Sequence, residues 1–421
     1  MEVKPKVAFR TLGCKLNQAE TELLAWRFAQ AGYGVTSGDE ADVCVVNTCT
    51  VTHIADRKSR HLLRLLRRRN PEALVVATGC YAERAPQELA RIGAGLVVGN
   101  DRKMHLLDLV KDKLASAPCH SAERSVADGT NRVRSFIKIQ DGCGYSCAYC
   151  VVPAVRRREY CLSVEEITGE VKARTFAGYN EVTLTGTKIG AYNHGNADLR
   201  RLVQRILADT DVERVRLSSL QPQEISAELL GLWQDRRLCR HFHLALQSGS
   251  DTVLRRMGRR YSIADYERAV SLIRRAVPDA AITTDVMVGF PAESVEEFEE
   301  SYSFCQGMGF ANTHVFVYSP RPGTSASRMR LQVNDWLKKE RSLRMLELAR
   351  QSAHAFRERF LRGNAMVLWE RETTPGSGVY SGLSDNYIRV FTESHQLLTN
   401  RLLPVRLVRL DERGLWGEVM K

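Results

Sequence analysis

The sequence predicts an α/β protein in three parts: an open parallel-sheet domain, a central partial barrel of six βα units, and a small C-terminal antiparallel β-barrel. Two stretches, before residue 115 and from residue 132 to about 320, alternate short β-branched runs with helical patterns. The last 60 residues lack helical periodicity and hold short strands and glycine-rich turns. We place the boundaries at 1–116, a linker over 117–131, 132–360 and 361–421.

The composition agrees with several folded domains. The 421 residues are 44% apolar and 26% charged, which excludes wholesale disorder, collagen-like structure and coiled coil. The chain has no run of about 18 apolar residues and no secretory signal, so we expect a cytoplasmic protein without a membrane partner. The net charge of +12 favours an anionic partner such as nucleic acid. In a reducing compartment, 11 cysteines point to metal or redox chemistry rather than disulfides.

Short apolar runs and helical periods mark the expected elements. In the first domain we expect strands at 7–10, 43–46, 74–77 and 96–98, and helices near 18–31, 54–69 and 86–92. In the second domain we expect six strands, at 133–139, 181–185, 213–218, 241–246, 281–287 and 313–318. Six units are too few to close an eight-stranded barrel, so the barrel should be partial. A helical stretch at about 334–362 should lead to the C-terminal barrel.

Three helices should begin at a capping box, in which the first side chain bonds the backbone three residues further on. The spacing predicts these boxes at Asn17–Glu20, Ser163–Glu166 and Ser294–Glu297. The first of them would fix the start of the first helix of the N-terminal domain.

Three cysteines lie within eight residues directly after the first strand of the second domain: Cys143, Cys147 and Cys150. This CxxxCxxC spacing lets one loop wrap a single metal centre. Structural zinc takes four protein ligands, and no fourth Cys or His lies nearby, whereas three thiolates suit an iron–sulfur cube with one iron left open. A zinc knuckle completed from elsewhere in the chain, or buried cysteines without a metal, are the alternatives.

The triplet resembles the signature of the radical S-adenosylmethionine enzymes, with Tyr149 as the aromatic residue before the last cysteine. The resemblance implies that the open iron binds S-adenosylmethionine and that electron transfer cleaves it to a 5′-deoxyadenosyl radical. A barrel carries its site at the carboxyl ends of its strands, and polar residues follow or end the predicted strands here. With Tyr149, these residues should contact S-adenosylmethionine: Thr185, Gly186, Ser218, Gln247, Ser248 and Asp285.

Cys14, Cys49 and Cys80 share no local spacing, but each follows a predicted parallel strand of the first domain. The carboxyl ends of parallel strands lie side by side, so these thiols can converge on one metal centre. Gly13 and Gly79 precede two of the cysteines and permit tight turns close to a ligand. From spacing alone, three buried cysteines that serve as small apolar residues remain the alternative.

The segments around these cysteines resemble the methylthiotransferase branch of the same superfamily. The matching segments are Thr11–Asn17, Asn47–Thr52, Thr78–Glu83, Leu246–Asp251, Thr284–Pro291 and Arg321–Thr324. The resemblance covers nearly the whole chain, including a C-terminal barrel similar to the RNA-binding TRAM domain. It implies that Cys14, Cys49 and Cys80 hold a second 4Fe-4S cluster, which carries the sulfur to be inserted. One S-adenosylmethionine would methylate that sulfur, and another would make the radical that activates a carbon–hydrogen bond.

The chain departs from the family's usual pattern after the radical triplet. Relatives usually read Pro-x-x-Arg-Gly and then Ser-Arg, whereas this chain reads Pro153-Ala-Val-Arg156-Arg157-Arg-Glu-Tyr-Cys161-Leu-Ser163, and the altered stretch Arg156–Ser163 receives no role. Ala245 and Ala292 replace a common proline and a common glycine. All six cluster cysteines are present. Five others fit neither triplet and should be structural: Cys44, Cys119, Cys161, Cys239 and Cys305.

Seven basic residues lie within the thirteen residues from Arg57 to Arg69, on the helix after the second cysteine. No acidic residue lies between them to form pairs along the helix. An unpaired basic stripe beside a sulfur-bearing site favours phosphate contacts with RNA over a merely solvated face. The residues that recur at helical spacing are Arg57, Arg60, Arg64 and Arg67.

Within the branch, Thr11–Glu22 and Thr48–Arg60 are most similar to enzymes that act on N6-threonylcarbamoyladenosine next to the anticodon. The resemblance implies that the radical removes hydrogen from C2 of adenine and that the methylated sulfur replaces it. The partners would be the anticodon stem-loop of tRNA, an electron donor such as flavodoxin or ferredoxin, and a sulfur donor. The alternatives are action on N6-isopentenyladenosine in tRNA, a non-catalytic zinc and RNA-binding protein, and an electron-transfer protein with two clusters.

Overall fold

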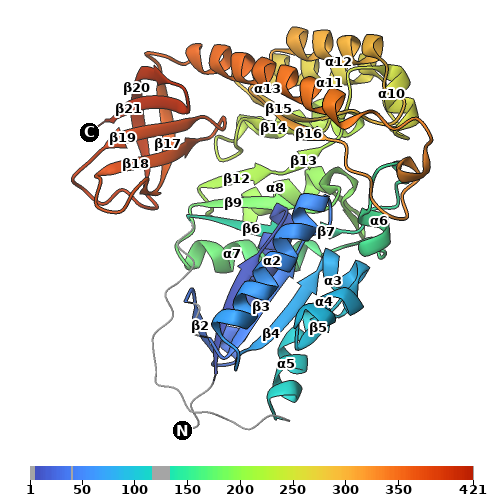
Figure 1. Ribbon diagram of the computed structural model, residues 1–421. Coiled ribbons are helices and arrows are strands. Elements are labelled where there is room, and N and C mark those ends of the chain that lie inside the picture. The colour runs from blue at the N-terminus through green and yellow to red at the C-terminus, as the bar shows by residue number, and fades with distance from the viewer. Residues whose placement is uncertain (1–4, 39–40, 116–132, 421) are drawn as a thin grey trace.

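The structure, a computed structural model, describes residues 5–38, 41–115 and 133–420. Figure 1 shows three parts: an α/β domain in blue, a curved central sheet with helices on its outer side in green to orange, and a small barrel in red. The predicted fold class is confirmed by this arrangement. The predicted linker over 117–131 lies outside the described residues.

The N-terminal domain is a five-stranded parallel sheet in the order β2-β1-β3-β4-β5. The strands are β1 (Lys6–Thr11), β2 (Gly34–Thr36), β3 (Val43–Thr48), β4 (Leu74–Gly79) and β5 (Leu96–Val98). Two apolar clusters, one on each face, bury every residue of β3. The covering helices are α1 (Lys15–Gln30), α2 (His53–Arg69), α3 (Cys80–Arg84), α4 (Pro86–Ile92), the 3-10 helix η1 (Asn100–His105) and α5 (Leu106–Ala115). The four predicted strands are present, and β2 was missed because Gly-Val-Thr holds a single apolar residue and forms no apolar run.

Helix α1 begins at Lys15, with Cys14 at its N-cap position, so the predicted capping box at Asn17–Glu20 is wrong. Asn17 and Glu20 lie inside the helix and are buried, because both form hydrogen bonds with other parts of the chain. The Asn17 amide donates to the carbonyl oxygens of Leu12 at 2.8 Å and Thr48 at 3.1 Å. These bonds tie α1 to the carboxyl ends of β1 and β3.

The central domain carries the six predicted parallel strands around a partial barrel. They are β6 (Arg134–Lys138), β9 (Glu181–Thr185), β12 (Arg214–Leu217), β14 (His241–Leu244), β15 (Ala281–Val288) and β16 (Asn312–Val317). After Ser218 the third strand continues as β13 (Ser219–Leu220). Because β12 pairs with β9 while β13 pairs with β14, this one segment joins a three-stranded and a four-stranded sheet.

The helices of the central domain begin where their capping residues predict. The capping boxes at Ser163–Glu166 and Ser294–Glu297 are both formed, at the starts of α7 (Val164–Phe176) and α12 (Val295–Met308). A third box, Ser262–Asp265, starts α11 (Ile263–Ala276) and was missed because its partner is an aspartate. The remaining α-helices are α6 (Val152–Val155), α8 (Leu199–Asp209), α9 (Ala227–Leu230) and α10 (Asp251–Arg256).

A long helix, α13 (Asp335–Glu358), packs against β16 and α12 and leads to the C-terminal domain. Among the described residues, every helix is too short or too polar to cross a membrane. The C-terminal domain is a closed barrel in the order β17-β18-β19-β21-β20, as predicted, but its strands are not all antiparallel, because β19 pairs with β21 in parallel. Its strands are β17 (Asn364–Glu372), β18 (Val379–Ser384), β19 (Arg389–Glu393), β20 (Leu402–Asp411) and β21 (Gly414–Val419).

The C-terminal barrel docks against the amino-terminal end of the central strands. Arg214 of β12 donates to the carbonyl oxygen of Leu383 in β18 at 2.9 Å, and Arg216 donates to that of Asp385, in the turn after β18, at 3.0 Å. In the same turn, the Tyr387 ring stacks on the His241 ring of β14, with centroids 4.1 Å apart. The turn covers the amino-terminal end of the central barrel, so the barrel interior opens toward the carboxyl ends of its strands.

Candidate functional site

Three cysteines lie on one loop at the carboxyl end of the first central strand. The loop runs from the short strand β7 (Gln140–Asp141), which pairs with β8 (Tyr160–Cys161), to α6. The Cys150 N–H donates to the Cys147 carbonyl oxygen at 3.0 Å. Burial, with a smaller contribution from the neighbouring thiols of Cys147 and Cys143, raises the pKa of Cys150 to about 12. The loop therefore brings the three thiols of the CxxxCxxC motif together.

Cationic side chains surround this loop. Arg259 Nη1 lies 3.4 Å from Cys147 Sγ, so a fixed positive charge contacts the middle cysteine of the motif. The Tyr145 ring lies between two more cations, with its centroid 3.7 Å from Lys188 Nζ and 4.0 Å from the guanidinium carbon of Arg260. Positive charge of this kind stabilises a group that carries thiolate and sulfide ligands.

Most residues predicted to contact S-adenosylmethionine lie on the cysteine loop or at the end of a strand: Tyr149, Thr185, Gly186, Ser218, Gln247 and Ser248. The buried Ser218 hydroxyl has no hydrogen-bond partner among the described residues. Just after the neighbouring strand β9, Gly186 packs closely against β7, because a Cβ there would come within 2.7 Å of the Gln140 carbonyl oxygen. The unpartnered Ser218 hydroxyl suits a polar ligand. Asp285 differs, because it lies three residues before the end of β15 and faces deeper into the barrel.

The second triplet lies at the carboxyl ends of three neighbouring strands. Cys14, Cys49 and Cys80 follow β1, β3 and β4. A Cβ on Gly13, at φ +99°, would come 2.7 Å from the Cβ of Cys49, and one on Gly79, at φ +95°, would come 2.4 Å from a side-chain oxygen of β3. Burial raises the pKa of Cys49 to about 12, with Cys80 and Cys14 adding to the shift. Three thiols that are scattered in the sequence thus converge.

The two triplets fit an iron–sulfur cluster better than a single zinc ion. The ligands of one zinc ion, at about 2.3 Å from the metal, stand about 3.8 Å apart. In the part of the chain that the structure describes, the one group of metal-type ligands within 4.8 Å of one another holds no cysteine: His243, Asp285 and His314. The thiols of each triplet are therefore spread more widely, as a multi-iron cluster requires, and three thiolates leave one iron open.

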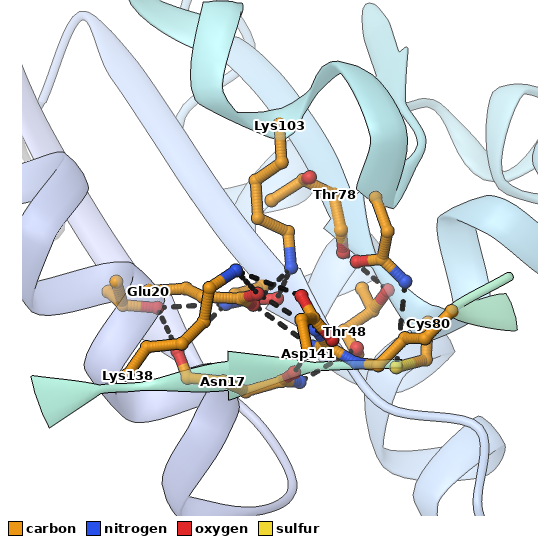
Figure 2. Close-up of polar contacts among 12 residues, drawn as sticks. Asn17, Glu20, Thr48, Thr78, Cys80, Lys103, Lys138 and Asp141 are labelled. Atoms are coloured by element: carbon orange, nitrogen blue, oxygen red, sulfur yellow. Dashed lines mark hydrogen bonds and ion pairs between the residues drawn. The ribbon is translucent and has the colours of Figure 1, made fainter. Parts of the chain in front are cut away.

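A buried network of charges lies between the domains that carry the two triplets (Figure 2). Arg156, in the stretch that departs from the family pattern, donates to Glu20 Oε1 and Asp141 Oδ1, both at 2.8 Å. Its second terminal nitrogen donates to Asn17 Oδ1 at 2.9 Å. Lys138 Nζ bridges the same two carboxylates, at 3.2 Å from Glu20 and 2.9 Å from Asp141. Side chains of the N-terminal and central domains are thus bonded around one guanidinium group.

The network extends to the second triplet. The Asn100 amide donates to the Val155 carbonyl oxygen at 2.7 Å and lies 3.8 Å from Cys80 Sγ. Lys103 Nζ lies 2.5 Å from Glu20 Oε2. Three buried cations therefore face two buried carboxylates, a surplus of one positive charge beside three thiols: Lys103, Lys138 and Arg156 against Glu20 and Asp141.

The carboxylates of this network are charged at neutral pH. Burial alone would raise the pKa of Glu20, but Lys103, Arg156 and Lys138 outweigh burial and hold that pKa well below its ordinary value. Against the same effect of burial, Arg156 and Lys138 lower the pKa of Asp141. The sequence reasoning missed these five residues. The available signal was Glu20, a charged residue on the side of α1 that otherwise faces the core.

A second polar junction lies beside Cys49. Asp56 of α2 accepts hydrogen bonds from Thr50 Oγ1 at 2.6 Å, from Arg84 Nη2 at 3.0 Å and from Arg321 Nη2 at 2.5 Å. Arg321, which is buried, belongs to the Arg-Pro-Gly-Thr segment of the central domain. This segment therefore contacts the N-terminal domain next to the second triplet.

The interior of the central barrel is polar below the strand ends. On β14, Phe242 and Leu244 pack outward against the helices, so the two histidines between and before them face inward. His243 Nε2 lies 3.3 Å from Asp285 Oδ2, and His314 of β16 offers a ring nitrogen within 4.8 Å of both. Burial lowers the pKa of His314, and Asp285 opposes this shift, while the charges of His243 and Lys15 lower the pKa further. Helix α1, which begins at Lys15, packs against β6 and β9 of the barrel, so Lys15 lies at the edge of the same space. Burial lowers the pKa of Lys15, and Tyr387 and Asp285 oppose this shift.

No sequence motif singled out Lys15, His243 or His314. The signal that could have found the two histidines is the alternation of polar residues along strands that are otherwise apolar. Lys15 could not have been placed, because it comes from a helix of the other domain.

Helix α2 exposes a basic surface that differs in part from the predicted stripe. Arg57, Lys58, Arg64 and Arg68 are exposed, and none of them forms an ion pair within the described residues. Arg60 instead donates to the Tyr81 hydroxyl at 2.7 Å and lies 3.4 Å from Glu88 on α4. The free bases therefore exclude Arg60 and include Lys58.

Residues 6–99 match the model of an uncharacterized protein family, UPF0004, and residues 137–305 match that of the Radical SAM superfamily. The threonylcarbamoyladenosine tRNA methylthiotransferase MtaB of Aquifex aeolicus is 38% identical over 93% of this chain and 97% of its own length. That of Bacillus subtilis is 34% identical over 96% and 94%. A tRNA-2-methylthio-N(6)-dimethylallyladenosine synthase of Acetivibrio thermocellus is 29% identical over 99% and 92%.

The solved structure of the radical S-adenosylmethionine methyltransferase TsrM from Kitasatospora setae covers 77% of this chain and 77% of its own, with a TM-score of 0.59 and 17% identity, which shows a shared fold. The similarity to the methylthiotransferases is one of sequence, and it runs over nearly the full length of both chains. Both cysteine triplets lie within the matched regions. The chain therefore belongs to the methylthiotransferase family of radical S-adenosylmethionine enzymes.

Proposed function

We propose that this enzyme converts N6-threonylcarbamoyladenosine, next to the anticodon of tRNA, to its 2-methylthio derivative. The observation that carries the proposal is that the two domains with the three-cysteine sites are hydrogen-bonded to each other around one buried arginine, Arg156. The names of the relatives in Aquifex and Bacillus support the choice of substrate. As a radical S-adenosylmethionine methylthiotransferase, the enzyme uses S-adenosylmethionine and two 4Fe-4S clusters.

In this proposal the two triplets have different roles. Cys143, Cys147 and Cys150 hold the cluster that, with S-adenosylmethionine bound, supplies a 5′-deoxyadenosyl radical, while Cys14, Cys49 and Cys80 hold the cluster that carries sulfur. The residues at the strand ends would orient S-adenosylmethionine: Tyr149, Thr185, Gly186, Ser218, Gln247 and Ser248. The buried network around Arg156 fixes the distance between the two sites, so the sulfur and the activated carbon meet in one space.

The three domains divide this work. Residues 1–116 would carry the sulfur-bearing cluster, and residues 132–360 would form the radical domain. Residues 361–421 would bind RNA as a TRAM-like barrel. The exposed bases of α2 would contact phosphates of the anticodon stem-loop, because they lie on the helix that follows Cys49 and have no acidic partner within the described residues.

The reaction also needs partners that renew the two sites. Reductive cleavage of S-adenosylmethionine consumes one electron, so we propose an electron donor such as flavodoxin or ferredoxin. Each product carries away one sulfur atom, so a sulfur donor is required as well. We place the enzyme in the cytoplasm, where its tRNA substrate is found.

Mass spectrometry of tRNA nucleosides tests the proposed substrate. Cells that lack the gene should lose 2-methylthio-N6-threonylcarbamoyladenosine, and the intact gene should restore this nucleoside while a Cys14→Ala gene should not. Loss of 2-methylthio-N6-isopentenyladenosine instead would assign the enzyme to the alternative substrate. Zinc without iron or sulfide in anaerobically purified protein would support the non-catalytic RNA-binding protein.

A further inference from the structure

We infer that Lys15 and His314 recognise the carboxylate of the threonylcarbamoyl group inside the central barrel. The inference rests on the proposed function for the identity of the nucleoside. It assigns Asp285 to the nucleoside rather than to S-adenosylmethionine. We call the residues of this proposed site the interior cluster: Lys15, His243, Asp285, His314 and Phe316.

The interior cluster is built from three adjacent strands and one helix of the other domain. His243 Nδ1 shares a hydrogen bond with Thr283 Oγ1 at 2.9 Å, which turns Nε2 toward Asp285 Oδ2 at 3.3 Å. On the neighbouring strand, His314 is paired in register with Asp285 and is exposed. Lys15 is half-buried, and within the described residues no hydrogen bond or ion pair occupies its ammonium group. The cluster thus combines a fixed His–Asp pair with two unpartnered donors.

The charges of the cluster match an amino-acid substituent. The carboxylate of a threonylcarbamoyl group would pair with Lys15 and accept a hydrogen bond from His314. Its hydroxyl and N–H groups are donors, and the carboxylate of Asp285 is an acceptor. A divalent cation is a poorer ligand, although His243, Asp285 and His314 lie within 4.8 Å of one another. The ammonium group of Lys15 shares this space and would repel the cation.

The position of the cluster along the strands suits the nucleoside as well. Phe316 lies two residues beyond His314 on the same face of β16, about 6.6 Å nearer the carboxyl end. Its ring is 45% exposed, and an exposed aromatic ring is a surface on which a base can stack. In adenine, N1 lies between C2 and C6, and C6 carries the N6 substituent. When the base stacks on Phe316 with C2 toward the carboxyl ends of the strands, its N6 substituent therefore points away from those ends, toward His314.

The cluster would also separate two related substrates. An apolar isopentenyl group in this space would desolvate Lys15 and Asp285 without offering either a partner. A site that hydrogen-bonds a polar group of its substrate discriminates strongly against an analogue without that group. An apolar site discriminates less strongly against an analogue with an added polar group. Lys15 and His314 are therefore specificity-determining residues.

The test is the affinity of the reconstituted holoenzyme, with S-adenosylmethionine bound, for two anticodon stem-loops. One carries N6-threonylcarbamoyladenosine, and the other carries the same nucleoside with its carboxylate converted to a carboxamide. The wild-type enzyme should bind the acid about 10-fold to 100-fold more tightly, the range of one charge-assisted hydrogen bond. Lys15→Met and His314→Phe should each reduce the preference, and the double variant should bind both stem-loops within about twofold.

Matched controls separate this effect from damage to the fold. Lys172→Met removes an exposed lysine of α7 and should keep the full preference for the acid. Iron content should be unchanged in Lys15→Met, which lies next to Cys14, and Lys15→Arg should retain most of the preference. His314→Phe is far from both triplets in sequence and tests the same claim independently.

Three results would overturn the inference: equal binding of acid and amide by the wild type, a preference that survives in both variants, or a stoichiometric divalent metal that His314→Phe loses. The test is separable from that of the proposed function. If the wild-type enzyme prefers the acid but forms no 2-methylthio product, the proposed function is wrong and the binding site is supported. If it forms the product but binds acid and amide alike, the proposed function is supported and the binding site is wrong.

Discussion

Arg156 hydrogen-bonds the two domains that carry the cysteine sites to each other. The residue is 5% exposed, and its guanidinium group donates to Asn17 and Glu20 of the N-terminal domain and to Asp141 of the central domain. The planar guanidinium group serves all three acceptors at once, and Lys138 bridges the same two carboxylates. The position of one cysteine site relative to the other therefore depends on this network, together with the Arg321–Asp56 and Asn100–Val155 contacts between the same domains.

Replacement of Arg156 by methionine should lower the free energy of unfolding by about 3–5 kcal/mol. In the variant, the buried carboxylates of Glu20 and Asp141 lose a cation that hydrogen-bonds both of them. Denaturant unfolding under anaerobic conditions measures the change. The neighbouring Arg157 is exposed, so Arg157→Met should change stability by no more than about 0.5 kcal/mol. Equal losses in the two variants would show that the network does not hold the domains together.

Sequence reasoning could find the cysteines but not this network. Cys143, Cys147 and Cys150 are marked by local spacing, and the strands that precede the other three cysteines are marked by apolar runs. Arg156 and Glu20 are 136 residues apart, and no local pattern relates them. The Asn17–Glu20 pair even has the spacing of a helix cap, although both residues point into the interface. Buried long-range polar contacts depend on the tertiary fold, which local spacing does not contain.

At the scale of elements, helix α2 has two faces with different roles. Leu63 and Leu66 pack into the core of the N-terminal domain, and Asp56 accepts hydrogen bonds from Arg84 and Arg321. The opposite face is basic and exposed. The sequence predicted the helix and its basic face, but not that Arg60 leaves the face to bond Tyr81, a residue of another helix.

The double variant Lys58→Gln/Arg64→Gln should weaken the binding of every tRNA by a similar factor. It should also reduce the dependence of that binding on salt concentration. Loss of two phosphate contacts should lower the slope of log affinity against log salt concentration by about 1.4–1.8. Filter binding or fluorescence anisotropy at several salt concentrations measures the slope. Lys172→Gln, on α7, is the control and should keep the wild-type slope. An unchanged slope in the double variant would mean that α2 is only a solvated face.

At the scale of the whole molecule, the C-terminal barrel is fixed to the central one by a stacked pair of rings. Burial and the nearby charges of Arg216 and Lys15 hold the pKa of His241 well below its ordinary value of 6.5, so His241 is neutral when stacked on Tyr387. The unfolded chain binds this proton near the ordinary pKa. The stability that depends on neutral His241 is therefore complete above about pH 6.5 and is lost as pH falls below it.

The free energy of unfolding should fall more steeply below about pH 6.5 in the wild type than in His241→Gln. The difference between the two slopes should approach 1.4 kcal/mol per pH unit, the value for one proton. Denaturant unfolding between about pH 5 and 8 measures both slopes, and the subtraction removes the other titrating groups. Parallel curves would show that His241 does not stay neutral at this interface.

The central claim is that the two triplets hold separate clusters with separate roles, and product analysis of two matched variants tests it most directly. Cys80→Ala and Cys147→Ala, each reconstituted anaerobically, should both contain about four irons per chain instead of about eight. With reductant, S-adenosylmethionine and a stem-loop that carries N6-threonylcarbamoyladenosine, Cys80→Ala should still form 5′-deoxyadenosine but no 2-methylthio product. Cys147→Ala should form neither. Methylthiolation by Cys80→Ala, or 5′-deoxyadenosine from Cys147→Ala, would contradict the account.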